Sequence, residues 1–94
     1  MSITLSVCIP TFNRAAYIGE TLDCIVSQAT DAVETVVVDG GSNDGTEQIV
    51  RNWQHDFPQL RYFRRETNLG VERDTDKTVE LARGEYFWIG NAST

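Results

Sequence analysis

The residues best suited to bind a ligand stand where two apolar segments end. A β-branched run, 36–38, stops abruptly at Asp39 and is followed by glycines and a polar turn, 42–46. An earlier apolar segment, 5–10, is followed by another polar turn, 11–14. In open α/β sheets, ligands bind just outside the carboxyl ends of the strands. Polar side chains at two such strand ends therefore predict a ligand site that the two turns share.

Two of the candidate ligand-binding residues, Asp39 and Arg73, could instead have a purely structural role. Asp39 could cap the turn that follows it through its own carboxylate. Arg73 could be a surface residue that pairs with neighbouring acids, since exposed ion pairs are common and weak. Binding and structural roles stay open for both residues. Asp74, Asp76 and Lys77 are expected to form a solvated, charged helix face.

Strand and helix patterns alternate along the whole chain. Short apolar segments predict strands at 5–10, 33–38, 60–64 and 86–89. Helical spacing of apolar residues predicts helices at about 15–29, from 44–46 to 57, and at 71–82. Strands that alternate with helices imply right-handed crossovers and parallel pairing. The expected fold is α/β: a Rossmann-like, mainly parallel sheet of about four strands flanked by helices on both faces.

Local signals refine these elements. Segment 33–38 is nearly continuous in β-branched residues, which is typical of a strand buried on both faces. Asn13 is the better candidate to cap the first helix, and Asn43 or Asp44 the second. The second helix is expected to end at Phe57, because the residue before a proline disfavours helix.

Composition limits the classes of function. The 94 residues allow one small domain, and the formal charge of −6 with a single lysine argues against a nucleic-acid surface. The arginines at 61, 64 and 65 are expected to form a solvated strand end. Cys8 and Cys24 are expected to be buried, reduced thiols. The sequence has no secretory leader and no apolar run of membrane-spanning length, so a cytoplasmic protein is expected.

One common nucleotide-binding signature is missing. A dinucleotide-binding sheet needs Gly-x-Gly-x-x-Gly directly after its first strand, whereas that turn here reads Pro-Thr-Phe-Asn-Arg at 10–14. A phosphate-binding Gly-Lys-Ser/Thr loop is also absent from the sequence. A dinucleotide oxidoreductase is therefore disfavoured.

Four blocks of the sequence together resemble a known family. These are 6–14 (SVCIPTFNR), 22–28, 36–46 (VVVDGGSNDGT), and 68–71 with 82–86 (NLGV and ARGEY). Their order and spacing resemble the opening of an inverting family 2 glycosyltransferase of the GT-A fold, over nearly the whole chain. Such enzymes transfer a sugar from a nucleotide-diphosphate donor to an acceptor hydroxyl, in polysaccharide or cell-envelope glycan synthesis among other pathways. The resemblance implies that 1–94 is the N-terminal, nucleotide-sugar-binding part of such a domain, truncated.

The resemblance also implies roles for particular residues. The nucleotide base and ribose would be lined by Pro10, Thr11, Asn13 and Arg14. Asp39 would reach the base or ribose, and Arg73 would lie near the base or the diphosphate. Asp76 stands where many members carry an asparagine. The donor would be a UDP-, GDP-, CDP- or dTDP-sugar.

The sequence departs from the family pattern in three places. Gly40 replaces a second acid at the end of the second strand, and Thr75-Asp76 replaces a common Arg-Asn pair. Residues 90–94 read GNAST, where members carry an Asp-x-Asp motif that holds Mg²⁺ or Mn²⁺. The general base of the family also lies beyond position 94. No catalytic or metal-binding residue is therefore assigned within this chain.

Two hypotheses of function follow from these departures. In the first, the chain is a fragment of an enzyme, inactive alone, whose metal is not bound within its own residues. In the second, it is a non-catalytic nucleotide-binding or interaction module of the same fold. A half-domain would also expose a sheet edge, which invites self-association.

Overall fold

The computed structural model describes residues 5–27, 32–67, 70–84 and 86–89. Within these ranges strands and helices alternate strictly along the chain. They are β1 (Leu5–Thr11), α1 (Ala15–Val26), β2 (Val33–Asp39), α2 (Thr46–Asp56), β3 (Leu60–Arg64), α3 (Val71–Leu81) and β4 (Tyr86–Ile89). The predicted alternation is confirmed. The prediction that the first helix reaches Ala29, and that for residues 90–94, fall outside the described residues.

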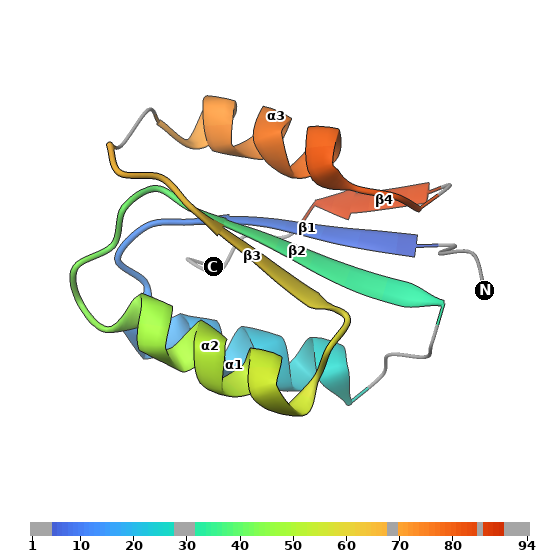
Figure 1. Ribbon diagram of the computed structural model, residues 1–94, viewed down its shortest axis with the longest axis horizontal. Helices are drawn as coiled ribbons and strands as arrows, with labels where there is room; N and C mark the ends of the chain where they lie inside the picture. The colour runs from blue at the N-terminus through green and yellow to red at the C-terminus, as the bar shows by residue number, and fades with distance from the viewer. Residues whose placement is uncertain (1–4, 28–31, 68–69, 85, 90–94) are drawn as a thin grey trace.

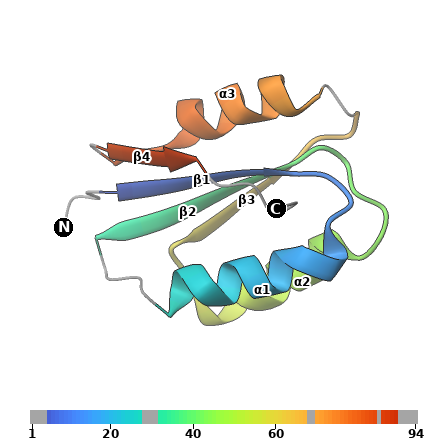
Figure 2. The same cartoon turned by 180° about the vertical axis from the view of Figure 1, so that it is seen from behind.

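The strands form one four-stranded sheet in the order β3-β2-β1-β4. Every neighbouring pair is parallel, so the predicted parallel sheet is confirmed. Helices α1 and α2 cover one face of this sheet, and α3 covers the other (Figures 1 and 2). The carboxyl ends of β1, β2 and β3 consequently lie at one edge, where the turns after them meet.

Side-chain alternation along the strands builds the main core between the sheet and the pair α1 and α2. Alternate residues of β1 point to opposite faces. Val7 and Ile9 pack in the core cluster, whereas Cys8 interacts with Thr78 of α3 on the other face. The core cluster contains Val7, Ile9, Ile18, Leu22, Val37, Val50 and Leu60. Each such side chain contributes roughly 1.5–3 kcal/mol when fully buried.

The central strand β2 is buried on both faces, as its β-branched sequence predicted. Val36, Val37 and Val38 have no exposed surface. Helix α2 ends at Asp56, and Phe57 lies outside the helix with φ −135°, so the predicted stop before Pro58 is confirmed. Within the described ranges, no helix is both long and apolar enough to cross a membrane.

A buried carboxylate at the amino edge of the sheet was not anticipated. Glu34 is 1% exposed, and its Oε2 accepts hydrogen bonds from Ser6 Oγ and the Arg83 N–H, both at 2.6 Å. Its Oε1 pairs with Arg61 at 3.3 Å. Burial alone would raise the pKa of Glu34, but these hydrogen bonds outweigh it and hold the pKa below its ordinary value. Glu34 thereby joins β1, β2, β3 and the turn after α3.

Three expectations about charged residues and thiols were wrong. Cys24 is exposed, although both cysteines are reduced thiols as expected. Arg61 and Arg65 are not merely solvated, since they pair with the buried acids Glu34 and Asp74. Asp74 is 2% exposed and does not belong to a solvated face. The sequence does not reveal these ion pairs, because the two residues of each pair come from different strands, helices or turns.

Candidate functional site

The two predicted strand ends stand side by side at the carboxyl edge. Thr11 of β1 is in register with Asp39 of β2, which is in register with Arg64 of β3. Backbone bonds continue the ladder past the strands: Gly40 N–H donates to the Thr11 carbonyl at 2.8 Å, and Arg65 N–H donates to the Asp39 carbonyl at 2.8 Å. The turns after β1, β2 and β3 are therefore held at fixed distances from one another.

Asp39 holds the turn that follows it. Its Oδ1 accepts hydrogen bonds from the N–H groups of Gly41 and Ser42, at 3.0 and 2.8 Å, and from Ser42 Oγ at 2.7 Å. The hydroxyl of Tyr62 donates to Oδ2. Burial and this bond to Asp39 raise the pKa of Tyr62 above its ordinary value. Asp39 has no exposed surface, so the structure shows the turn-capping role that the sequence left open.

Asn13 and Ser42 connect the two turns directly. The Asn13 N–H donates to Ser42 Oγ at 2.7 Å, and the Asn43 N–H donates to Asn13 Oδ1 at 2.9 Å. Asn13 adopts φ 51°, a left-handed conformation that asparagine tolerates better than most residues. The side-chain oxygen Oδ1 of the predicted site residue Asn13 thus accepts a hydrogen bond from the turn after β2.

Asp44 caps both neighbouring helices. Its Oδ2 accepts from Ala15 N–H at the start of α1, at 3.0 Å, and its Oδ1 accepts from Thr46 N–H and Oγ1, at 3.1 and 2.6 Å. Thr46 Oγ1 in turn accepts from Arg14 N–H at 3.1 Å. The prediction that Asn13 caps α1 was wrong, because the cap reaches α1 from the other turn. Asp44 lies in the turn that leads into α2, next to the Gly45 N-cap.

Pro10 and Thr11 are buried at the end of β1. Thr11 is 5% exposed, and within the described residues its Oγ1 has no hydrogen-bond partner. A buried hydroxyl without a partner costs roughly 1–3 kcal/mol, so such groups usually bind water or a ligand. Thr11 is the candidate whose side chain has unused hydrogen-bonding capacity at this edge.

Arg14 lies next to Asn13, whereas Arg73 and Asp76 belong to α3, on the other face of the sheet from α1 and α2. Arg14 is half-buried and donates through Nη1 to the Asn13 carbonyl at 3.2 Å. Arg73 is exposed in the first turns of α3, and its carbonyl accepts from Arg65 Nη2 at 3.4 Å. Asp76 is exposed further along α3. The structure therefore brings Pro10, Thr11, Asn13, Arg14 and Asp39 together, with Arg73 joined to them through Arg65.

Sequence reasoning missed several residues of this edge. Phe12 is 38% exposed beside Asn13, although large apolar side chains are usually buried. Arg64 Nη2 donates to the Ser42 carbonyl at 2.7 Å, which fixes the second turn from β3. The position of Phe12 inside the polar turn 11–14 was a signal that could have identified it. The bond of Arg64 could not be foreseen, because its partner is a backbone atom of another strand end.

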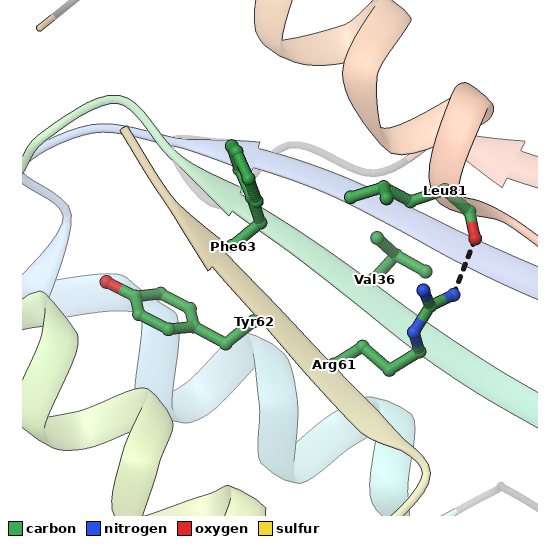
Figure 3. Close-up of a pocket in the computed structure, with 5 residues that line it drawn as sticks. All are labelled: Val36, Arg61, Tyr62, Phe63 and Leu81. Atoms are coloured by element: carbon green, nitrogen blue, oxygen red, sulfur yellow. Dashed lines mark hydrogen bonds between the residues drawn. The ribbon is translucent and has the colours of Figure 1, made fainter. Parts of the chain in front are cut away.

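Two pockets lined by described residues lie along β3. The first, about 130 Å³, is lined by Val36, Arg61, Tyr62, Phe63 and Leu81, and the Arg61 guanidinium reaches the Leu81 carbonyl beside it (Figure 3). It contains none of the candidate residues. The second, about 350 Å³, is open and lined by residues 63–67, the last two residues of β3 and the three that follow. This second pocket adjoins the carboxyl end of β3.

The described residues do not fit a metal centre. Within the ranges that the structure describes, no three side chains among His, Cys, Asp and Glu are grouped so that they could hold an ion. The carboxylates of Asp39 and Asp44 are instead used by backbone N–H groups and hydroxyls. The arrangement is suited to binding a polar ligand between rigid turns.

Known proteins share this architecture. The glycosyl transferase family 2 pattern matches residues 6–92. An abequosyltransferase of Salmonella typhimurium is 39% identical over 89 residues, which are 90% of this chain and 26% of that protein. The structure of S. aureus TarS in complex with UDP-GlcNAc superposes with a TM-score of 0.89 at 31% identity, covering 96% of this chain and 26% of that one.

A second solved structure has the same fold. The mannosyltransferase of Pyrobaculum calidifontis, in complex with GDP-Man and Mn²⁺, superposes with a TM-score of 0.88 at 33% identity, over 98% of this chain and 28% of that one. The chain thus spans about a quarter of the length of the abequosyltransferase. With a family pattern that extends over nearly all of its residues, this chain belongs to glycosyl transferase family 2.

Proposed function

We propose that this chain is the nucleotide-sugar-binding part of a glycosyltransferase that acts in the synthesis of a polysaccharide or cell-envelope glycan. One observation carries the proposal: the turns after β1 and β2 and the start of α3 meet at the carboxyl edge of a parallel sheet. Solved structures of the same fold carry UDP-GlcNAc or GDP-Man. A relative in Campylobacter jejuni, 31% identical, is a glucosyltransferase that acts on an undecaprenol-linked glycan.

The side chains of the edge divide into two groups. Asp39, Ser42 and Asp44 shape the turns, because their polar atoms are engaged with neighbouring backbone. Contact with the donor is proposed first for Thr11, through its unpaired hydroxyl, and for the exposed Arg73. Contacts from Pro10, Asn13, Arg14 and Asp76 stay predictions from the sequence. A direct contact between Asp39 and the nucleotide stays a prediction.

Phe12 adds a flat apolar surface to this group. Its ring is 38% exposed at the end of β1, where a nucleoside base could stack on it. Stacking of a base on an aromatic side chain contributes roughly 1–3 kcal/mol by alanine substitution. Phe12 is therefore proposed as the base platform, and Arg73 as a cation for the base or diphosphate.

The chemistry of transfer is not assigned to the described residues. A divalent metal would neutralise the charge of the departing diphosphate, but these residues do not form a site for it. An inverting course and a cytoplasmic location stay predictions that rest on the sequence. Self-association through the unpaired outer edge of β3 in this sheet is a further proposal, testable by sedimentation over a range of concentrations.

Calorimetric titration of the chain with UDP, GDP, CDP and dTDP tests the proposal. We expect one of these to bind, and binding to weaken by roughly tenfold in Phe12→Ala or Thr11→Val. Tyr17→Ala is the control for Phe12, because Tyr17 is an aromatic residue exposed on α1. Binding of none of the four would contradict the nucleotide-binding proposal. Binding without transfer in an assay with Mn²⁺, nucleotide sugars and acceptors would leave the binding-module alternative in force for the chain alone.

A further inference from the structure

Arg65, the first residue after β3, joins three elements of the candidate site. Its N–H donates to the Asp39 carbonyl at the end of β2. Its side chain reaches α3, where Nε donates to Asp74 Oδ1 at 2.6 Å and Nη2 donates to the Arg73 carbonyl at 3.4 Å. One residue therefore ties the end of β2 to the helix turn that carries Arg73.

The pair between Arg65 and Asp74 is well shielded from water. The two side chains are 17% and 3% exposed. Salt screens exposed ion pairs, but it screens buried pairs much less. The guanidinium has a planar fork of donors, which allows it to hold a carboxylate and a carbonyl at once. A lysine ammonium at position 65 could pair with Asp74, but it lacks this second, oriented donor.

The backbone of Arg65 also fixes the turn after β2. Its carbonyl lies 3.2 Å from the point where a side chain at Gly41 would begin. Gly41 adopts φ +99°, a conformation that glycine takes without strain. The backbone at Arg65 thus packs directly on the turn that Asp39 holds. Arg65 therefore contacts both this turn and the start of α3.

We infer that Arg65 is a positioning residue for the donor site, and that it acts by holding Arg73 at a set distance from the turns after β1 and β2. Asp74 anchors the guanidinium, and the guanidinium fixes the Arg73 carbonyl. This inference rests on the proposed function, in which Arg73 contacts a nucleoside diphosphate. The inference gives the buried ion pair of Arg65 and Asp74 a part in donor recognition. Both residues lie outside the four sequence blocks that resemble the family.

The test compares Arg65→Lys, Arg73→Ala and the double variant. Arg65→Lys keeps the ion pair with Asp74 and is expected to stay folded with a nearly unchanged melting temperature. Its affinity for the preferred nucleoside diphosphate is expected to fall by roughly fivefold or more, a loss typical of one hydrogen bond. The double variant is expected to bind no more weakly than Arg73→Ala alone, since residues that act through one another are non-additive.

Arg83→Lys is the matched control. Arg83 also pairs with a buried acid, Glu34, but at the amino edge of the sheet. Its replacement is expected to leave nucleotide affinity unchanged. Hydrogen exchange without nucleotide supplies an independent readout: amides in the first turns of α3 are expected to exchange faster in Arg65→Lys and Arg65→Ala but not in Arg83→Lys.

The outcomes separate the two claims. Unchanged exchange in α3 together with unchanged affinity in Arg65→Lys would overturn the positioning role, as would additive losses in the double variant. If the unaltered chain binds none of the four nucleotides, the proposed function fails. In that case the exchange data still decide whether Arg65 holds the start of α3.

Discussion

The backbone N–H of Asn13 donates a 2.7 Å hydrogen bond to Ser42 Oγ, and this hydroxyl in turn donates to the buried carboxylate of Asp39. A single side chain oxygen thus connects the turn after β1 with the turn after β2. Removal of the hydroxyl would therefore leave the Asn13 N–H without this acceptor and would weaken one of the bonds that hold the two turns together.

Ser42→Ala should therefore destabilise the chain. It leaves the Asn13 N–H without its acceptor and deprives Asp39 of one of its donors. The expected loss is roughly 1–3 kcal/mol in the free energy of unfolding, measured by urea denaturation. Ser27→Ala is the control, because the Ser27 hydroxyl is exposed and donates to the Cys24 carbonyl one helix turn away. Equal losses in the two variants would contradict the connecting role of Ser42.

Asp44→Ala should weaken the starts of two helices at once. Loss of an N-terminal cap costs about 0.5–2 kcal/mol per helix, so thermal unfolding should occur at a lower temperature. Asp56→Ala, at the opposite end of α2, should not lower it, since an acid there opposes the helix dipole. A melting temperature of Asp44→Ala equal to that of the unaltered chain would argue against the double cap.

The Asp44 cap should also depend on pH. Burial raises the pKa of Asp44, but the hydrogen bonds from Thr46 and Ala15 outweigh it and place the pKa below its ordinary value. A lowered pKa in the folded state means that the stabilisation is complete above the ordinary pKa and is lost as the pH falls through the folded value. The difference in stability between the chain and Asp44→Ala should accordingly shrink in acid.

Comparison of Gly41→Ala with Gly45→Ala separates the cost of a strained backbone from the cost of a steric clash with the new methyl group. Both glycines have left-handed backbones, with φ +99° and +97°. A Cβ at Gly41 would lie 3.2 Å from the Arg65 carbonyl. At Gly45, apart from its chain neighbours, no heavy atom of the described residues lies within 4 Å of such a Cβ. Both variants should be less stable by roughly 1 kcal/mol from backbone strain. Gly41→Ala should lose more, and the excess measures how tightly the Arg65 segment packs on the turn.

Glu34→Gln should destabilise the amino edge of the sheet without altering nucleotide binding. The glutamine amide has an NH2 group, which only donates, in place of one accepting oxygen, so it cannot accept from Ser6, Arg61 and the Arg83 N–H together. We expect a loss of roughly 1–3 kcal/mol in urea denaturation at neutral pH. The pKa of Glu34 is lowered, so this contribution disappears as the pH falls below its ordinary range, and the two chains should converge in acid. Glu80→Gln, in an exposed pair with Lys77, is the control.

The sheet and its helices were predictable because apolar spacing reports burial directly. The run at 36–38 required a strand buried on both faces, and the structure shows it. The direction of the Asp39 carboxylate was not predictable, because a strand-end acid can turn outward to a ligand or inward to its own turn. Its inward orientation depends on Tyr62, which lies on another strand.

Burial of acids was the least predictable feature. Glu34 interrupts an apolar strand, and its partners Ser6, Arg61 and Arg83 are far from it in sequence. Asp74 sits among charged neighbours in α3, so local sequence suggests a solvated residue. Its burial follows only once α3 is docked and Arg65 is brought beneath it.

The strand order has a consequence for synthesis on the ribosome. Of the four described strands β1 emerges first, yet one of its two neighbours is β4, which emerges last of the four. Pairing of Leu5 with Tyr86 must wait until every intervening element has left the exit tunnel. Until then β1 presents an unpaired edge, to which a strand of another nascent chain could bind. Docking of β2 onto β1 and of β3 onto β2 covers the other edge of β1 but leaves this one open during the interval.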